Sequence, residues 1–165
     1  MRCSRGSSRR ATSLVMSRPE TAADIAALYQ EMILDHYRRP RNKGTLVDPD
    51  ASAEMRNPLC GDEIDLQVNF AGDKVGELRF SGRGCSISQA SASMMTQIVE
   101  GKSASEVDAI RSRFRELMLG DVTAATDTRL GSLRALSGVS RFPARVKCAL
   151  LAWNALDHIL VSRKG

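Results

Sequence analysis

Three cysteines and an aspartate are the residues of this sequence best suited to chemistry. Cys60 stands two positions before Asp62 in a turn rich in Gly and Pro, at the start of an expected strand. Cys85 directly follows a Gly-Arg-Gly turn, and Cys148 falls in the first turns of the expected last helix. Residues two apart in an extended segment project to the same side, so Cys60 and Asp62 could bind one ion.

These four residues together match the donor set of a tetrahedral zinc site. Three thiolates and one carboxylate supply four ligands, the number that structural Zn²⁺ takes. Their negative charge would exceed that of the ion. Arg145 and Lys147, which flank Cys148, could offset the excess, as could Arg83, two residues before Cys85. Spacing alone leaves a second interpretation open, because three unrelated, half-buried cysteines would give the same pattern. The aspartate also has an alternative role as an ordinary turn residue.

Helix starts favour two of these thiols as ligands. Cys85 is expected where a strand gives way to a helix, and Cys148 near the beginning of the last helix. The positive end of a helix dipole stabilises a thiolate. Glycines next to Cys60 and Cys85 would let the backbone approach a shared centre closely.

Composition predicts one soluble domain with no affinity for nucleic acid. The 165 residues are 42% hydrophobic and 26% charged, and no apolar run is long enough to cross a membrane. The net charge of +5 comes from residues 1–18, which hold five arginines and no acid. Removing these five from the 24 basic residues leaves 19 against 19 acidic ones, so the rest is neutral.

Domain boundaries and location are predicted from the same features. We expect residues 1–18 to be a disordered basic tail, or a segment that precedes a true start at Met16, and 19–165 to form a single domain. The tail lacks the apolar stretch of a secretory signal. Four cysteines without such a signal indicate a reducing, cytoplasmic location.

The hydrophobic periodicity predicts an α+β fold, a small antiparallel sheet of about three strands packed against helices. A capping box at Thr21 opens a helix that should end at Arg38 or Arg39, before a loop over 41–51. Alternating residues then indicate a hairpin with strands around 64–70 and 77–80.

Three more helices are expected after the hairpin. The apolar spacing predicts them over 87–99, over 103–117 and from Pro143 to about 160. Residues 120–141 carry several Gly, Ser and Thr, so we expect mostly loop there.

Four sequence blocks resemble the motifs of the IscU/SufU-type iron–sulfur cluster assembly proteins. The resemblance extends over about residues 25–160 and is specific in the order and the wording of its blocks. The blocks are LYQEMILDHYRRPRNKG (28–44), NPLCGDEIDLQV (57–68), GRGCSISQASASMM (82–95) and RVKCALLAW (145–153).

The resemblance implies a ligand set and a role. The family's functional cysteines fall on Cys60, Cys85 and Cys148, and its functional aspartate on Asp62. Lys147 stands where the scaffold branch has a histidine, and a long connection precedes the last helix, as in the SufU branch. Such proteins bind zinc through these ligands and accept sulfur from a SufS-type cysteine desulfurase.

Cys60 is the expected sulfur acceptor, because its turn is the ligand segment best able to move. The chain would act like a sulfurtransferase rather than a conventional enzyme, and would serve downstream iron–sulfur assembly proteins. Two alternatives stay open: a scaffold that binds iron or assembles a [2Fe–2S] cluster on the same ligands, and a zinc-stabilised interaction domain without catalysis.

Other residues receive structural interpretations. We expect His158 at an exposed helix end, His36 in packing or docking rather than in a metal site, and the Met94-Met95 pair in the core. The basic residues between Arg38 and Lys43 fit either a partner-binding patch or a solvated loop.

Overall fold

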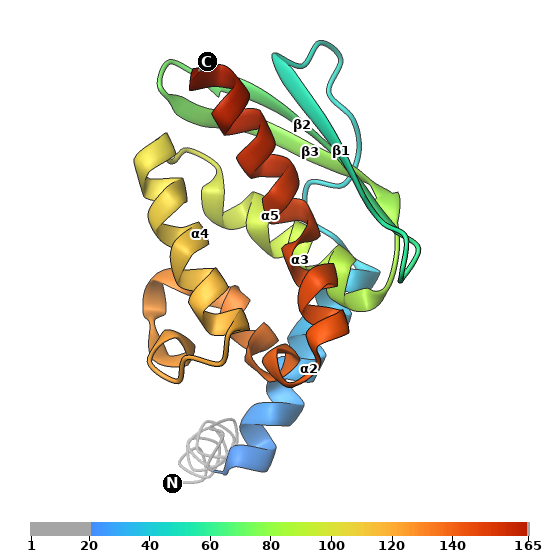
Figure 1. Cartoon of the computed structure of the whole chain (residues 1–165), viewed down its shortest axis with the longest axis vertical. Coiled ribbons are helices and arrows are strands. Elements are labelled where there is room, and N and C mark those ends of the chain that lie inside the picture. Colours follow the sequence, from blue (N-terminus) through green and yellow to red (C-terminus); the bar gives the residue numbers. More distant parts are fainter. Residues whose placement is uncertain (1–20, 165) are drawn as a thin grey trace, which may run out of the picture.

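The computed structural model describes residues 21–164, so the expected tail over 1–18 lies outside the described residues. One helix is followed by three consecutive strands and then by helices only, the segregated arrangement predicted for an α+β fold (Figure 1). The elements in chain order are α2 (Ala22–Arg38), β1 (Ala51–Asn57), β2 (Asp62–Ala71), β3 (Lys74–Arg83), α3 (Ser86–Val99), α4 (Ala104–Met118), η1 (Ala124–Thr126), η2 (Thr128–Arg141) and α5 (Pro143–Lys164).

The sheet is antiparallel with the strand order β1-β2-β3, as expected. Asn57 pairs with Asp62 across the first turn, and Glu63 pairs with Arg83 at the end of β3. The β1–β2 turn and the exit from β3 therefore meet at one end of the sheet. The candidate ligands of residues 60–62 and residue 85 are brought to this end by register alone.

One face of the sheet forms the core. Five of its side chains are completely buried, and helices α3 and α5 cover them (Figure 1): Ile64, Leu66, Val68, Leu78 and Phe80. Helix α4 packs on the other side of α5, where the rings of Phe114 and Trp153 stack 5.4 Å apart. The Met94-Met95 pair is fully buried in this core, as predicted.

Helix α5 extends from the ligand end of the sheet to the opposite end. Its carboxyl-terminal turn is attached to the β2–β3 hairpin by Arg163, which donates a hydrogen bond to the carbonyl of Gly72. The Arg163 guanidinium also lies over the ring of Phe70, 3.7 Å from its centroid. Cys148 is near the other end of the same helix.

Residues 120–141 differ from the expectation of mostly loop. They form the 3₁₀ segments η1 and η2, kinked at Gly131. Four apolar residues spaced three apart face the core, which matches the three-residue turn of a 3₁₀ helix: Leu130, Leu133, Leu136 and Val139. The surrounding Ser, Thr and Gly residues obscure this period in the sequence, and it does not fit α-helical spacing.

Helix α2 has the predicted capping box and the predicted end, with Arg39 as its C-cap. Its first turns are less buried than the apolar spacing suggested. Ile25 and Leu28 are 41% and 47% exposed, and Ile25 lines a cleft of about 970 Å³ between α2, η2 and the start of α3.

Strand β1 is not predicted by its sequence pattern. Its inward positions hold two alanines, Met55 and Asn57, and they alternate with exposed polar residues. With Met55 as its one large apolar residue, the segment lacks the repeated apolar alternation typical of a strand.

Candidate metal centre

A four-residue turn between β1 and β2 holds Cys60. The backbone N–H of Cys60 donates to the carbonyl of Asn57 at 3.2 Å, and the N–H of Leu59 donates to the Asn57 side-chain oxygen at 3.3 Å. Gly61 has a φ of 68°, a left-handed conformation that glycine adopts at little cost. The turn leaves the Cys60 side chain half-buried at the rim of the sheet.

Asp62, the first residue of β2, is completely buried. Its Oδ1 accepts a hydrogen bond from the backbone N–H of Cys85 at 2.9 Å, which joins β2 to the start of α3. The other carboxylate oxygen lies 3.9 Å from the Cys85 sulfur. A buried carboxylate with one oxygen engaged and the other beside a thiol is well placed to bind a cation.

Cys85 is the N-cap of α3, so its predicted position at a helix start is confirmed. The N–H of Ser88 points at its sulfur, 3.5 Å away. The sulfur thus accepts from a backbone donor and lies at the positive end of the α3 dipole.

Cys148 lies in the second turn of α5 and is completely buried. Its sulfur is 3.6 Å from the carbonyl oxygen of Ala144 and 3.9 Å from the side-chain nitrogen of Asn57. Burial raises the pKa of the Cys148 thiol, and its contacts with Asp62 and Cys60 raise it further. Without a cation, this residue is therefore a neutral thiol at physiological pH.

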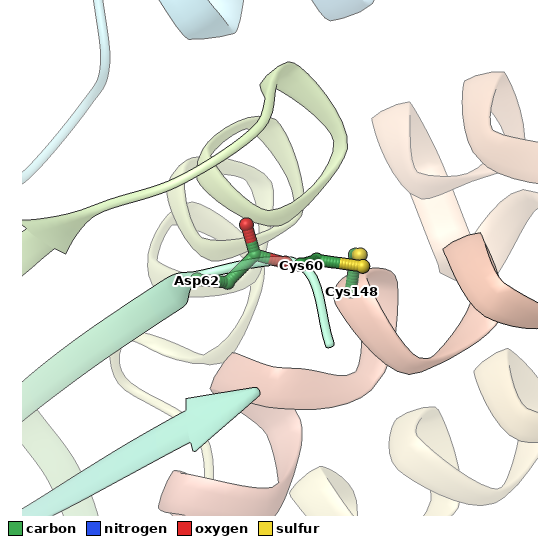
Figure 2. A group of neighbouring side chains, drawn as sticks. All are labelled: Cys60, Asp62 and Cys148. Atoms are coloured by element: carbon green, nitrogen blue, oxygen red, sulfur yellow. The ribbon is translucent and has the colours of Figure 1, made fainter. Parts of the chain in front are cut away.

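The structure brings three of the four predicted ligands into one tight group. The ligand atoms of Cys60, Asp62 and Cys148 all lie within 4.8 Å of one another, and Figure 2 shows the two sulfurs side by side next to the carboxylate. Cys85 is outside this group, but its sulfur is near the free oxygen of Asp62.

Zinc fits this donor set. A tetrahedral ion with Zn–S bonds of about 2.3 Å holds its ligand atoms roughly 3.5–4 Å apart. The 3.9 Å between the Cys85 sulfur and the Asp62 oxygen is within this range. The ligand atoms of Cys60, Asp62 and Cys148, all within 4.8 Å of one another, are close to it.

One of the three expected cations faces the site. Arg145 is near the cysteines, and the charge of a Cys85 thiolate, together with a hydrogen bond to it, raises the pKa of the Arg145 guanidinium. Lys147 is exposed on α5. Arg83, which stands two residues before Cys85, is paired with Glu63 at 3.5 Å instead. The structure therefore gives Arg145 the clearest electrostatic role at the rim.

Reasoning from sequence misses one contributor to the site and anticipates a second only in general terms. In the sequence Asn57 looks like an ordinary turn residue, yet its side chain contacts the Cys148 sulfur. Gly84 lies so close to Asp62 that a Cβ built on it would be 2.4 Å from Oδ1. A close approach of the backbone is expected at the glycine next to Cys85, but only the spatial arrangement shows that the Asp62 carboxylate is the group it approaches.

The two histidines are separate from the metal centre. His36 is buried, and its Nδ1 is 2.8 Å from the hydroxyl of Ser93 on α3. This contact fits the expected packing role. His158 is exposed on α5, as expected.

Comparison with known proteins identifies the protein family that has this fold and this set of ligand residues. Residues 28–149 match the family described as the NifU-like N terminal domain. The chain therefore belongs to the IscU/SufU family of iron–sulfur cluster assembly proteins.

Individual relatives come from both branches of the family. A zinc-dependent sulfurtransferase SufU of Bacillus subtilis (strain 168) is 45% identical over 144 residues, which cover 87% of this chain and 96% of the relative. An iron–sulfur cluster assembly scaffold protein IscU of Streptococcus pyogenes serotype M1 is also 45% identical, over 81% of this chain and 82% of the relative. Sequence identity alone therefore does not separate the branches.

A solved structure from Fervidobacterium islandicum AW-1 has a similar fold. It is named as a candidate iron–sulfur cluster assembly scaffold protein for the SUF system, and it superposes with a TM-score of 0.73 at 34% identity. The match covers 79% of this chain and 94% of that one, which confirms the predicted IscU/SufU-like architecture. Over the residues that the structure describes, no helix is long and apolar enough to span a membrane.

Proposed function

We propose that this chain is a zinc-bound sulfur acceptor that takes sulfur from the persulfide of a SufS-type cysteine desulfurase. The observation that carries the proposal is the meeting of Cys60, Asp62 and Cys148 within 4.8 Å, with the Cys85 sulfur beside them. The proposed ligands are Cys60, Asp62, Cys85 and Cys148. A bound zinc ion would keep their thiols deprotonated at neutral pH.

Cys60 is the proposed acceptor because it is on a turn, whereas Cys85 and Cys148 are held by helices. Its thiolate attacks the outer sulfur of the donor's persulfide. A new S–S bond forms on Cys60, the donor's S–S bond breaks, and the donor cysteine leaves as a thiolate with the electron pair. Atoms and electrons balance without an external oxidant or reductant.

The surface around the site supports contact with another protein. Leu59 in the Cys60 turn is 78% exposed, and Phe142, just before α5, is 60% exposed. Large exposed apolar side chains at the rim of a polar site are typical of an interaction surface. Arg145 is near the cysteines, where it would stabilise the developing thiolates. From this acceptor, sulfur would pass to downstream iron–sulfur assembly proteins in the cytoplasm.

A scaffold that assembles a [2Fe–2S] cluster on the same ligands is the second candidate. This candidate is retained because the streptococcal scaffold protein has the same 45% sequence identity to this chain as the SufU relative. The exposed Lys147 weakens it, because a protonated lysine beside Cys148 offers no lone pair to iron.

Desulfurase turnover with the purified chain tests the proposal. We expect the zinc-loaded chain to stimulate a SufS-type desulfurase and the metal-free chain not to do so. The Cys60→Ser and Cys60→Ala variants should lose all stimulation while keeping the circular dichroism of the wild type. Full stimulation by either variant removes Cys60 from the role. A coloured cluster that can be transferred to an apo-ferredoxin, without any stimulation, would favour the scaffold.

A further inference from the structure

Asn57 is a buried polar residue that the sulfur-transfer chemistry does not use directly. It ends β1, pairs with Asp62 across the turn and is only 7% exposed. Its side chain cannot be a zinc ligand of the usual kind, because its nitrogen is an amide donor. Burial of such a group is costly unless its donors and acceptors have partners. Those partners are all in the candidate metal centre.

Asn57 contacts both the turn that holds Cys60 and the Cys148 sulfur on α5. Its backbone carbonyl accepts the N–H of Cys60, and its side-chain oxygen accepts the N–H of Leu59. These two bonds shape the turn that holds Cys60. The side-chain nitrogen lies 3.9 Å from the Cys148 sulfur, on a different element.

The orientation of the amide follows from these contacts. Because the side-chain oxygen accepts the N–H of Leu59, the NH₂ group must be the end that faces Cys148. Reversing the amide would point two donors at each other. An N–H donor directed at the Cys148 sulfur suits a sulfur that is bound to a metal as thiolate.

We propose that Asn57 is a positioning residue that donates an N–H···S hydrogen bond to the metal-bound Cys148 thiolate while fixing the Cys60 turn. Hydrogen bonds from neighbouring groups orient metal ligands and tune their donor strength. This inference rests on the proposed metal site and assigns a role to a residue outside the ligand set.

Substitution with aspartate separates the two functions of the side chain. Asn57→Asp keeps an oxygen for the N–H of Leu59 but removes the N–H that faces the sulfur. Asn57→Ala removes both. Asn154→Asp makes the same chemical change at a solvent-exposed position of α5 and serves as the matched control.

Cobalt substitution gives a readout that is independent of sulfur transfer. At pH 8, where the new carboxylate is ionised, we expect the thiolate-to-Co²⁺ charge-transfer band of Asn57→Asp to move to lower energy. Loss of the hydrogen bond leaves more electron density on sulfur. We also expect zinc affinity, measured by competition with a chelator, to fall at least tenfold. Asn154→Asp should match the wild type in both measurements.

The outcomes distinguish this inference from the proposed function. A wild-type band and wild-type zinc affinity in Asn57→Asp would overturn the role of Asn57 and leave the zinc site intact. If the wild-type chain binds neither cobalt nor zinc, the site itself fails and this inference fails with it. If circular dichroism shows that Asn57→Asp does not fold, Asn57→Ala decides: a shifted band supports the inference and an unshifted band overturns it.

Discussion

Gly84 has no room for a side chain because the Asp62 carboxylate occupies that space. A Cβ on Gly84 would lie 2.4 Å from Asp62 Oδ1 and 2.6 Å from the Ser88 hydroxyl. Both distances are far below van der Waals contact, so one group would have to move. Since Ser88 is held within α3, the carboxylate is the group that would be displaced.

We therefore expect Gly84→Ala to weaken zinc binding at least tenfold. The added methyl pushes Asp62 away from the sulfurs, and the hydrogen bond from the Cys85 N–H is lost or lengthened. Competition with a chelator measures the affinity, and circular dichroism checks the fold. Gly138→Ala is the matched control, because a Cβ added at Gly138 would have no atom within 4 Å. Equal affinities for the two variants would contradict this explanation.

At the scale of elements, His36 attaches the end of α2 to α3. Its ring nitrogen meets the Ser93 hydroxyl, and the same hydroxyl accepts the N–H of Arg41 at 2.8 Å. Burial, and secondarily the charge of Arg41, lower the pKa of His36, while Asp35 opposes the shift. The folded chain therefore holds this imidazole neutral.

This lowered pKa predicts an acid-sensitive stability. Between about pH 6.5 and the lower folded pKa, the unfolded chain binds a proton at His36 that the folded chain does not. The free energy of unfolding should therefore fall as the pH falls below about 6.5, and level off once both states are protonated. Urea unfolding at pH 5–8 measures this. His36→Gln should flatten the dependence of the unfolding free energy on pH, whereas substitution of the exposed His158 by Gln should not. The same pH dependence in the wild type and both variants would rule out His36 as its source.

The connection over 120–141 owes its order to Arg113 on α4. The guanidinium bonds Asp127 and Glu116 at 2.8 and 2.7 Å, and the Thr123 hydroxyl at 3.0 Å. These contacts hold η1 and the start of η2 against α4. Together with the buried leucines of η2, they explain why a segment rich in Gly and Ser is not a loop.

Sequence reasoning finds the elements whose patterns are regular and misses those whose patterns are not. The capping boxes at Thr21 and Ser103 locate the starts of two helices, because each satisfies backbone donors in a recognisable way. Strand β1 is missed because register with β2, rather than its own composition, makes it a strand. The four candidate ligands are found by residue type, but Asn57 acts through a contact that only the fold creates.

For the whole molecule, the candidate ligands matter because they come from distant parts of the chain. They belong to the β1–β2 turn with the start of β2, to the start of α3 and to α5. An unfolded chain cannot present these groups together, so metal binding stabilises the folded state as a whole.

We expect removal of metal to lower the melting temperature, and added Zn²⁺ to restore it. Mg²⁺ should have no such effect, because it prefers oxygen ligands over thiolates. Differential scanning calorimetry of the chelator-treated chain, with and without each ion, measures the change. The Cys148→Ser variant should show no recovery with zinc. A melting temperature that is the same with and without zinc would argue against coupling between the site and the fold.

Because the far end of α5 is attached to the β2–β3 hairpin, residues cannot be inserted or deleted in this helix without moving Cys148. Cys148 and Arg163 lie on one uninterrupted helix, and Arg163 is fixed to the β2–β3 hairpin. One residue inserted between them would turn the cysteine about 100° around the helix axis relative to that anchor. Insertions and deletions should therefore be excluded from this stretch and accumulate before Pro143, in the connection over 120–141, where no ligand is displaced.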